Sequence, residues 1–155
     1  MFVLGFVIFL LSVFLGAIIL GGSLLDFINL PSLVLIIGPL VGVLIATKSF
    51  GVFIGGMKVV INPYRPLTEE LRGQAASLFR LLSKTTALTS AIFLVVSFVN
   101  LCLGLDFSSE FAQRHFLVNI AALLIMPLYG MILIAGLFEP VVFNLKKRRD
   151  TERKG

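Results

Sequence analysis

The sequence predicts an all-α membrane protein with four transmembrane helices and with both termini in the cytoplasm. The composition is the first reason: 58% of the residues are hydrophobic, 14% are charged, and the mean hydropathy is +1.07. A soluble domain carries roughly 25% charged residues. The second reason is that the hydrophobic residues form four runs. Each run must satisfy its own backbone hydrogen bonds in lipid, so each is expected to be a helix.

The four runs form one membrane domain over residues 1–155. Each is about as long as a helix that crosses the hydrocarbon core, and we expect the spans at residues 2–20, 32–53, 86–105 and 116–138. A cleaved secretory signal is the alternative for the first run. Such a signal begins with basic residues, and the first basic residue here is Lys48. We therefore expect the first run to remain as a helix.

The second and third runs are joined by a polar segment that predicts an amphipathic helix over residues 68–84. Thr68 is a suitable N-cap, and Glu69 and Glu70 would lie at the positive end of the helix dipole. We expect this helix to continue into the third span. Its apolar stripe could face a partner, a sister subunit or the lipid interface. Its candidate partner contacts, together with one acid near the end of the fourth span, are Leu71, Leu78, Phe79 and Glu139.

The basic residues set the expected orientation. The segment from Lys48 to Lys84 contains six Lys or Arg and two acids, and the basic tail of residues 145–155 again contains six and two. The turn between the third and fourth spans contains one basic residue, Arg114, and the turn between the first two spans contains no basic residue. Because basic loops remain inside, we expect the middle segment and the tail to be cytoplasmic. This distribution also argues against nucleic-acid binding.

Glycines recur at four-residue intervals in and after the second run. Small residues at this spacing allow helix backbones to approach closely in lipid. The alternative is that glycine is simply frequent in membrane helices. The candidate helix-packing residues are Gly38, Gly42, Gly51 and Gly55.

The sequence contains no pattern that is typical of an enzyme or a cofactor site. Cys102 and His115 are the only cysteine and histidine, so a metal site with several such ligands has no basis. Phosphate-binding glycine loops and Gly-x-Ser-x-Gly turns are also absent. We expect no enzyme activity, no cofactor and no metal.

Transport remains possible, but the expected spans contain no acid at mid-membrane. Such acids usually mark an ion path, so any carboxylate that carries a proton would have to come from another protein. Glu139 lies near the cytoplasmic end, where it fits a boundary residue. The hydroxyls of the third span could line a path, or they could bond to their own helix carbonyls. The candidate pore-lining residues are Thr89, Ser90, Ser97, Asn119 and Pro127.

Two blocks of the sequence resemble the MotA/TolQ/ExbB proton-channel family. The block from Gly21 to Gly38 (GGSLLDFINLPSLVLIIG) resembles the turn and second helix of MotA, the flagellar stator subunit. The block from Ala121 to Gly130 (AALLIMPLYG) resembles the fourth span of that family. The segments Leu137-Phe138-Glu139-Pro140 and Asn144 to Arg148 resemble the stretch after that span in the same family.

The resemblance implies a homo-oligomeric, pentamer-like ring in a bacterial inner membrane. Such a ring would surround helices of a MotB-like single-span partner whose membrane aspartate carries the proton, and ion flow would drive mechanical work. The segment between Lys48 and Thr85 is too short for the large cytoplasmic domain of MotA. A non-conducting four-helix scaffold is the main alternative, and a small solute exporter is a third.

Overall fold

The computed structural model describes residues 2–19, 21, 28–62, 68–103 and 110–152. Within these ranges the chain is helical and contains no strand, which confirms the all-α class. The elements, in chain order, are α1 (Phe2–Ile19), α2 (Leu30–Ala46), α3 (Phe50–Ile61), α4 (Glu69–Leu103), α5 (Glu110–Leu133), the π-helical turn η2 (Ile134–Phe138) and α6 (Glu139–Glu152).

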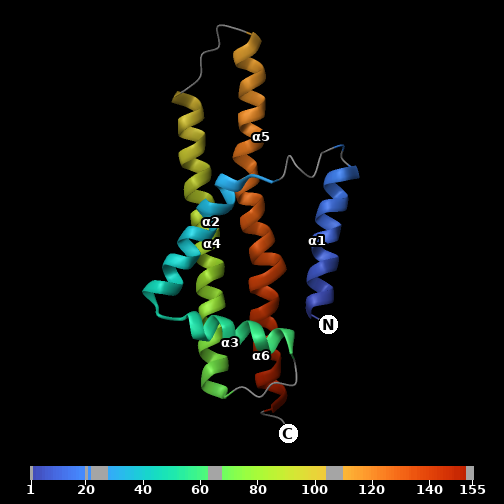
Figure 1. Cartoon of the computed structure of the whole chain (residues 1–155), viewed down its shortest axis with the longest axis vertical. Helices are drawn as coiled ribbons and strands as arrows, with labels where there is room; N and C mark the ends of the chain where they lie inside the picture. The colour runs from blue at the N-terminus through green and yellow to red at the C-terminus, as the bar shows by residue number, and fades with distance from the viewer. Residues whose placement is uncertain (1, 20, 22–27, 63–67, 104–109, 153–155) are drawn as a thin grey trace.

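Two long columns form the centre of the molecule. One column is α4, and the other is the continuous helix α5–η2–α6, which runs antiparallel to it (Figure 1). Helices α2 and α3 pack mainly on α4, and α1 packs on η2 and α3. The beginning of α1 and the end of α6 lie toward one end of the molecule, and the end of α4 and the beginning of α5 lie at the other (Figure 1).

The second hydrophobic run is divided by a sharp bend. We expected one helix over residues 32–53, whereas α2 ends at Ala46 and α3 leaves it at an angle of 110°. The Thr47 hydroxyl donates to the carbonyl of Val43 at 2.8 Å, and Lys48 adopts a left-handed conformation with φ of 51°. Side-chain bonding to the backbone competes with helix continuation. As a result, Lys48 lies in the turn and not inside a span.

Helix α2 begins at Leu30, two residues before the expected span. Asn29 is the N-cap, and its side-chain oxygen accepts a hydrogen bond from the Ser32 N–H at 3.2 Å. Pro31 lies in the first turn, where its missing N–H has no helical partner to lose. The helix continues through Pro39 to Ala46.

Helix α4 is one unbroken helix of 35 residues, which confirms that the amphipathic segment continues into the third hydrophobic run. The Leu71 N–H donates to the Thr68 hydroxyl at 3.4 Å, and the Arg72 N–H donates to the Thr68 carbonyl at 3.1 Å. At a rise of about 1.5 Å per residue, the helix is about 50 Å long. It therefore exceeds a hydrocarbon core of about 30 Å.

The other long column contains a π-helical turn next to Pro140. The N–H of Glu139 bonds to the carbonyl of Ile134, five residues earlier. Proline has no N–H for the carbonyl four residues before it, and one wider turn accommodates this loss. The column then continues as α6 without a break.

The buried core lies near the end of the molecule that carries the termini. On α4, buried residues recur from Arg72 to Ser90, whereas none of the residues from Ala91 to Leu103 is buried. Water requires apolar side chains to be covered, whereas lipid does not. The core cluster consists of Leu44, Ala75, Leu78, Phe79, Leu82, Phe138, Val141, Val142 and Leu145.

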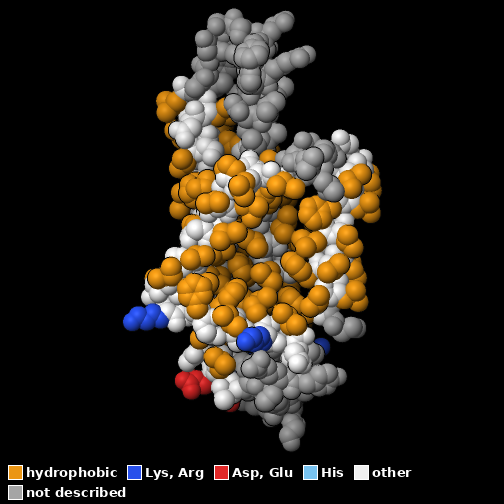
Figure 2. Space-filling view, viewed as in Figure 1, with side chains coloured by type: hydrophobic (Ala, Val, Ile, Leu, Met, Phe, Trp, Pro, Cys, Tyr) orange, Lys and Arg blue, Asp and Glu red, His pale blue; other side chains and the backbone are white. Residues whose placement is uncertain are grey.

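The helices are those of a membrane protein. Among the described residues, α4 and the segment Leu123–Lys147 are long and apolar enough to cross a membrane, and the bent pair α2–α3 would add a third span. Helix α1 contributes a shorter apolar stretch, Phe2–Gly16. Figure 2 shows hydrophobic side chains over the middle of the molecule, with the coloured charged side chains gathered near one end.

Candidate functional site: the hydroxyl row between α4 and α5–α6

Four hydroxyl side chains of α4 are buried within the chain, and Ser83 and Ser90 among them lie against the second column. The spacing of three and four residues places them on one side of the helix. Each is at most 8% exposed, although hydroxyl residues are mostly found at protein surfaces. The row consists of Ser83, Thr86, Thr89 and Ser90.

The lower end of the row is joined to α6 by a hydrogen bond. The Ser83 hydroxyl donates to the Glu139 carboxylate at 3.1 Å, between residues 56 positions apart in the sequence. This bond holds a carboxylate at the α4–α6 contact while Glu139 stays exposed. Glu139 is thus the acid nearest to the hydroxyl row among those whose side chains are described.

The middle of the row bonds to its own helix. The Thr86 hydroxyl donates to the carbonyl of Leu82 at 2.8 Å, the local bond that threonine commonly forms within helices. This is the second of the two interpretations that the sequence left open for the hydroxyls of this span. The hydrogen bond of the Thr86 hydroxyl is therefore made within α4 and not to the second column.

The upper end of the row packs tightly against Gly130 of α5. A Cβ atom at Gly130 would overlap the Ser90 hydroxyl oxygen and would lie 3.5 Å from the Thr86 methyl group. The Ser90 oxygen is buried and has no hydrogen-bond partner among the described residues. A side chain at position 130 would therefore have to displace the Ser90 side chain, which glycine leaves in place.

The other pore-lining candidates are placed less centrally. Ser97 and Pro127 are half-buried on α4 and α5, and the side chain of Asn119 lies outside the described ones. The structure buries both Thr89 and Ser90 within their own chain, and Ser90 lies between the two columns against Gly130. Their role as pore lining therefore stays a prediction.

The glycines that form close contacts differ from those that the spacing suggested. Among the described residues, no atom of another part of the chain lies within 4 Å of a Cβ placed at Gly38, Gly42 or Gly51, and a Cβ at Gly55 would meet Leu71 alone, at 3.6 Å. A Cβ at Gly56 would lie 2.7 Å from the Phe79 ring, and one at Gly136 would lie 2.8 Å from the Phe9 ring. Neither Gly56, Gly130 nor Gly136 was selected from the sequence, because the contacts depend on which helices meet.

The candidate partner contacts divide into two pairs. Leu78 and Phe79 are buried by their own chain, with the Phe79 ring centroid 5.3 Å from that of Phe53 and 6.2 Å from that of Phe138. Leu71 is half-buried beside Gly55, and Glu139 is exposed. Leu71 and Glu139 are the two candidates that remain accessible to another molecule.

The most apolar stretches of α2, α4 and α5–η2 carry no charged side chain. Between Leu30 and Ala46, between Thr86 and Leu103, and between Leu123 and Phe138 there is no Asp, Glu, Lys or Arg. The described side chains also form no group of three His, Cys, Asp or Glu that could hold a metal ion.

Comparison with known proteins adds no family. No protein-family model matches the sequence, and no curated protein matches it.

Proposed function

We propose that the chain is a MotA-like membrane subunit that crosses the bilayer four times and assembles into a ring around the helices of a partner. The partner would supply the aspartate that carries the proton, as in the family that the sequence resembles. The observation that carries the proposal is the uncharged, largely exposed apolar surface of the spanning helices. Such a surface suits lipid and other helices, and it provides no proton-binding group.

The arrangement of the columns supports this role. The antiparallel pair α4 and α5–α6 and the shared position of the two termini (Figure 1) agree with four spans and cytoplasmic ends. The charged residues around the beginning of α4 then lie inside, as the positive-inside rule requires. We place the protein in a bacterial cytoplasmic membrane, with a second copy of itself and a MotB-like single-span protein as partners.

Reconstitution tests conduction directly. The chain is co-purified with a candidate MotB-like partner, a single-span protein with an aspartate in its span, and inserted into liposomes that enclose a pH-sensitive dye. We expect an imposed potential to drive proton entry, and we expect Asp→Asn in the span of the partner to abolish it. A stable complex without proton flux would contradict the channel function.

A non-conducting scaffold is the second candidate, and one observation favours it. The hydroxyls of α4 are buried within the chain, where Ser83 bonds to Glu139 and Thr86 bonds to its own helix. In this case the same complex forms, and the Asp→Asn partner variant has no phenotype. The two candidates are therefore separated by flux and not by assembly.

A further inference from the structure

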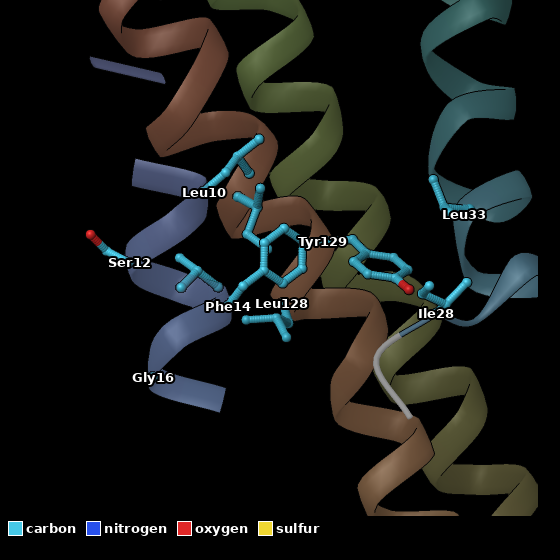
Figure 3. A pocket seen from close by; sticks show the side chains of 10 residues that line it. Leu10, Ser12, Phe14, Gly16, Ile28, Leu33, Leu128 and Tyr129 are labelled. Atoms are coloured by element: carbon cyan, nitrogen blue, oxygen red, sulfur yellow. The ribbon is translucent and has the colours of Figure 1, made fainter. Parts of the chain in front are cut away.

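A crevice of about 520 Å³ lies between α1, the beginning of α2 and α5. Leu10, Val13 and Phe14 line it from α1, and Leu128, Tyr129 and Ile132 line it from α5. Ile28 and Leu33 close the side toward α2 (Figure 3). Helix α1 meets the rest of the molecule lower down, where Phe6 and Phe9 lie against Gly136. The crevice is the space that remains between the upper part of α1 and the columns.

The two polar side chains in the lining are already engaged. The Ser12 hydroxyl donates to the carbonyl of Ile8 at 2.8 Å, within its own helix. The Tyr129 hydroxyl accepts a hydrogen bond from the backbone N–H of Asn29 at 2.8 Å. The remaining lining residues are apolar or glycine, so the crevice suits hydrocarbon and offers little to a polar ligand.

The size of the crevice distinguishes between two possible apolar occupants, a membrane-spanning helix of another chain and the acyl chain of a lipid. A single helical turn of about 5.4 Å height and about 10 Å diameter fills about 400 Å³. A helix of about 20 residues, as needed to cross a membrane, has more than five such turns, so a crevice of about 520 Å³ is far too small to enclose it. The volume of the crevice lies within the range of about 300–1,000 Å³ that is typical of small-molecule pockets.

We propose that this crevice binds one acyl chain of a membrane phospholipid. The α5 residues of the lining belong to the candidate span Leu123–Lys147, and α1 and α2 are apolar helices, so in the proposed four-span topology lipid tails are the hydrocarbon that surrounds the crevice. Without an occupant, the lining residues would lose the dispersion contacts that a filled space provides. The bound chain would also fill the gap between α1 and the columns. This proposal does not depend on ion conduction.

Photolabelling tests the proposal in the full chain. The protein is reconstituted into vesicles of phosphatidylethanolamine and phosphatidylglycerol that contain a trace of phosphatidylcholine with a diazirine in its acyl chain. After illumination, the labelled peptides are identified by mass spectrometry. We expect labelling to concentrate on the peptides of α1 and α5 that line the crevice, above the level on exposed apolar residues of α4.

A matched pair of substitutions makes the test specific. Val13→Phe places a ring in the crevice, whereas Val95→Phe makes the same change on α4 at a side chain that is 61% exposed. We expect Val13→Phe to lower labelling in the crevice about tenfold, since the ring excludes several buried methylenes. We expect Val95→Phe to leave labelling unchanged. If Val13→Phe fails to fold, Leu33→Phe and its exposed counterpart Leu88→Phe serve instead.

Two outcomes would overturn the proposal. The first is equal labelling of the crevice in Val13→Phe and Val95→Phe, because an acyl chain in the crevice cannot share its place with the ring. The second is a loss of labelling in the crevice that accompanies a change in oligomer mass. That result would show that a second copy of the chain occupies this surface in place of lipid.

Discussion

The ring of Phe79 occupies the place that a side chain at Gly56 would need. A Cβ atom at Gly56 would lie 2.7 Å from Phe79 Cε2 and 3.2 Å from the Cβ of Ala75. Phe79, which lies on α4, is fully buried. Its ring stacks against that of Phe53, which lies on α3 together with Gly56. Glycine at position 56 therefore allows α3 to lie directly across α4 despite its sharp departure from α2.

Gly56→Ala should destabilise the fold, because the added methyl group meets a buried ring that has no free space to move into. We expect a loss of about 1–3 kcal/mol in the free energy of unfolding. Gly51→Ala on the same helix meets nothing within 4 Å, and we expect a gain of up to about 1 kcal/mol from helix propensity. Thermal unfolding in mild detergent measures both, and equal midpoints for the two variants would contradict the contact.

Substitution by alanine should lower the free energy of unfolding at one end of the hydroxyl row and not at the other. Ser83→Ala removes the hydrogen bond to Glu139 and should cost about 1 kcal/mol. Ser90→Ala removes an oxygen that has no hydrogen-bond partner among the described residues and should be neutral or stabilising. Unfolding by a denaturing detergent gives both values. A larger loss for Ser90→Ala than for Ser83→Ala would indicate that Ser90 bonds to a water or to another chain.

Gly38→Leu and Gly42→Leu should lower the mass of the oligomer while the fold of each subunit is retained. Nothing within 4 Å opposes a side chain at either position, so the fold should tolerate both changes. If neighbouring subunits approach along this face of α2, leucine will hold their helices apart. Light scattering after size-exclusion chromatography in mild detergent measures the mass. Gly51→Leu is the control on α3, and an unchanged mass for all three variants would show that Gly38 and Gly42 face lipid.

Cys102 reports the orientation of α4. It is the only cysteine in the sequence, it is exposed, and it lies near the end of α4 that is farthest from Glu69. If the middle segment is cytoplasmic, an impermeant maleimide should label Cys102 in intact cells. The double variant Cys102→Ser, Ser77→Cys moves the thiol to an exposed site in the cytoplasmic part of α4, where labelling should require permeabilisation. The reverse pattern would invert the proposed topology.

Local sequence rules predicted the beginning of α4 better than that of α2. The Thr68 cap with its two glutamates follows from short-range hydrogen bonding, whereas the Asn29 cap begins α2 two residues before the expected span. The turn at residues 47–49 was missed because the hydrophobic run continues through it. Lys48 inside the expected span was the available signal, since a charge at that depth is costly.

The contacts between the columns were not predictable from local patterns. Gly130 and Ser90 lie 40 positions apart, and Ser83 and Glu139 lie 56 positions apart. Their pairing depends on the register of two long helices, which the hydrophobic pattern of a membrane span specifies poorly because nearly every position is apolar. The hydroxyl residues in this span indicated that their oxygens would need hydrogen-bond partners, but they did not indicate which residues those partners would be.

The wide turn at Ile134–Phe138 has a consequence for comparing this chain with others. A π turn contains one residue more than an α turn, so the positions after it advance by about 100° around the axis. The residues of α5 and those of α6 therefore follow two separate helical repeats, although the backbone is continuous. An alignment that imposes a single heptad frame from Glu110 to Glu152 will assign the wrong face to every position on one side of this turn.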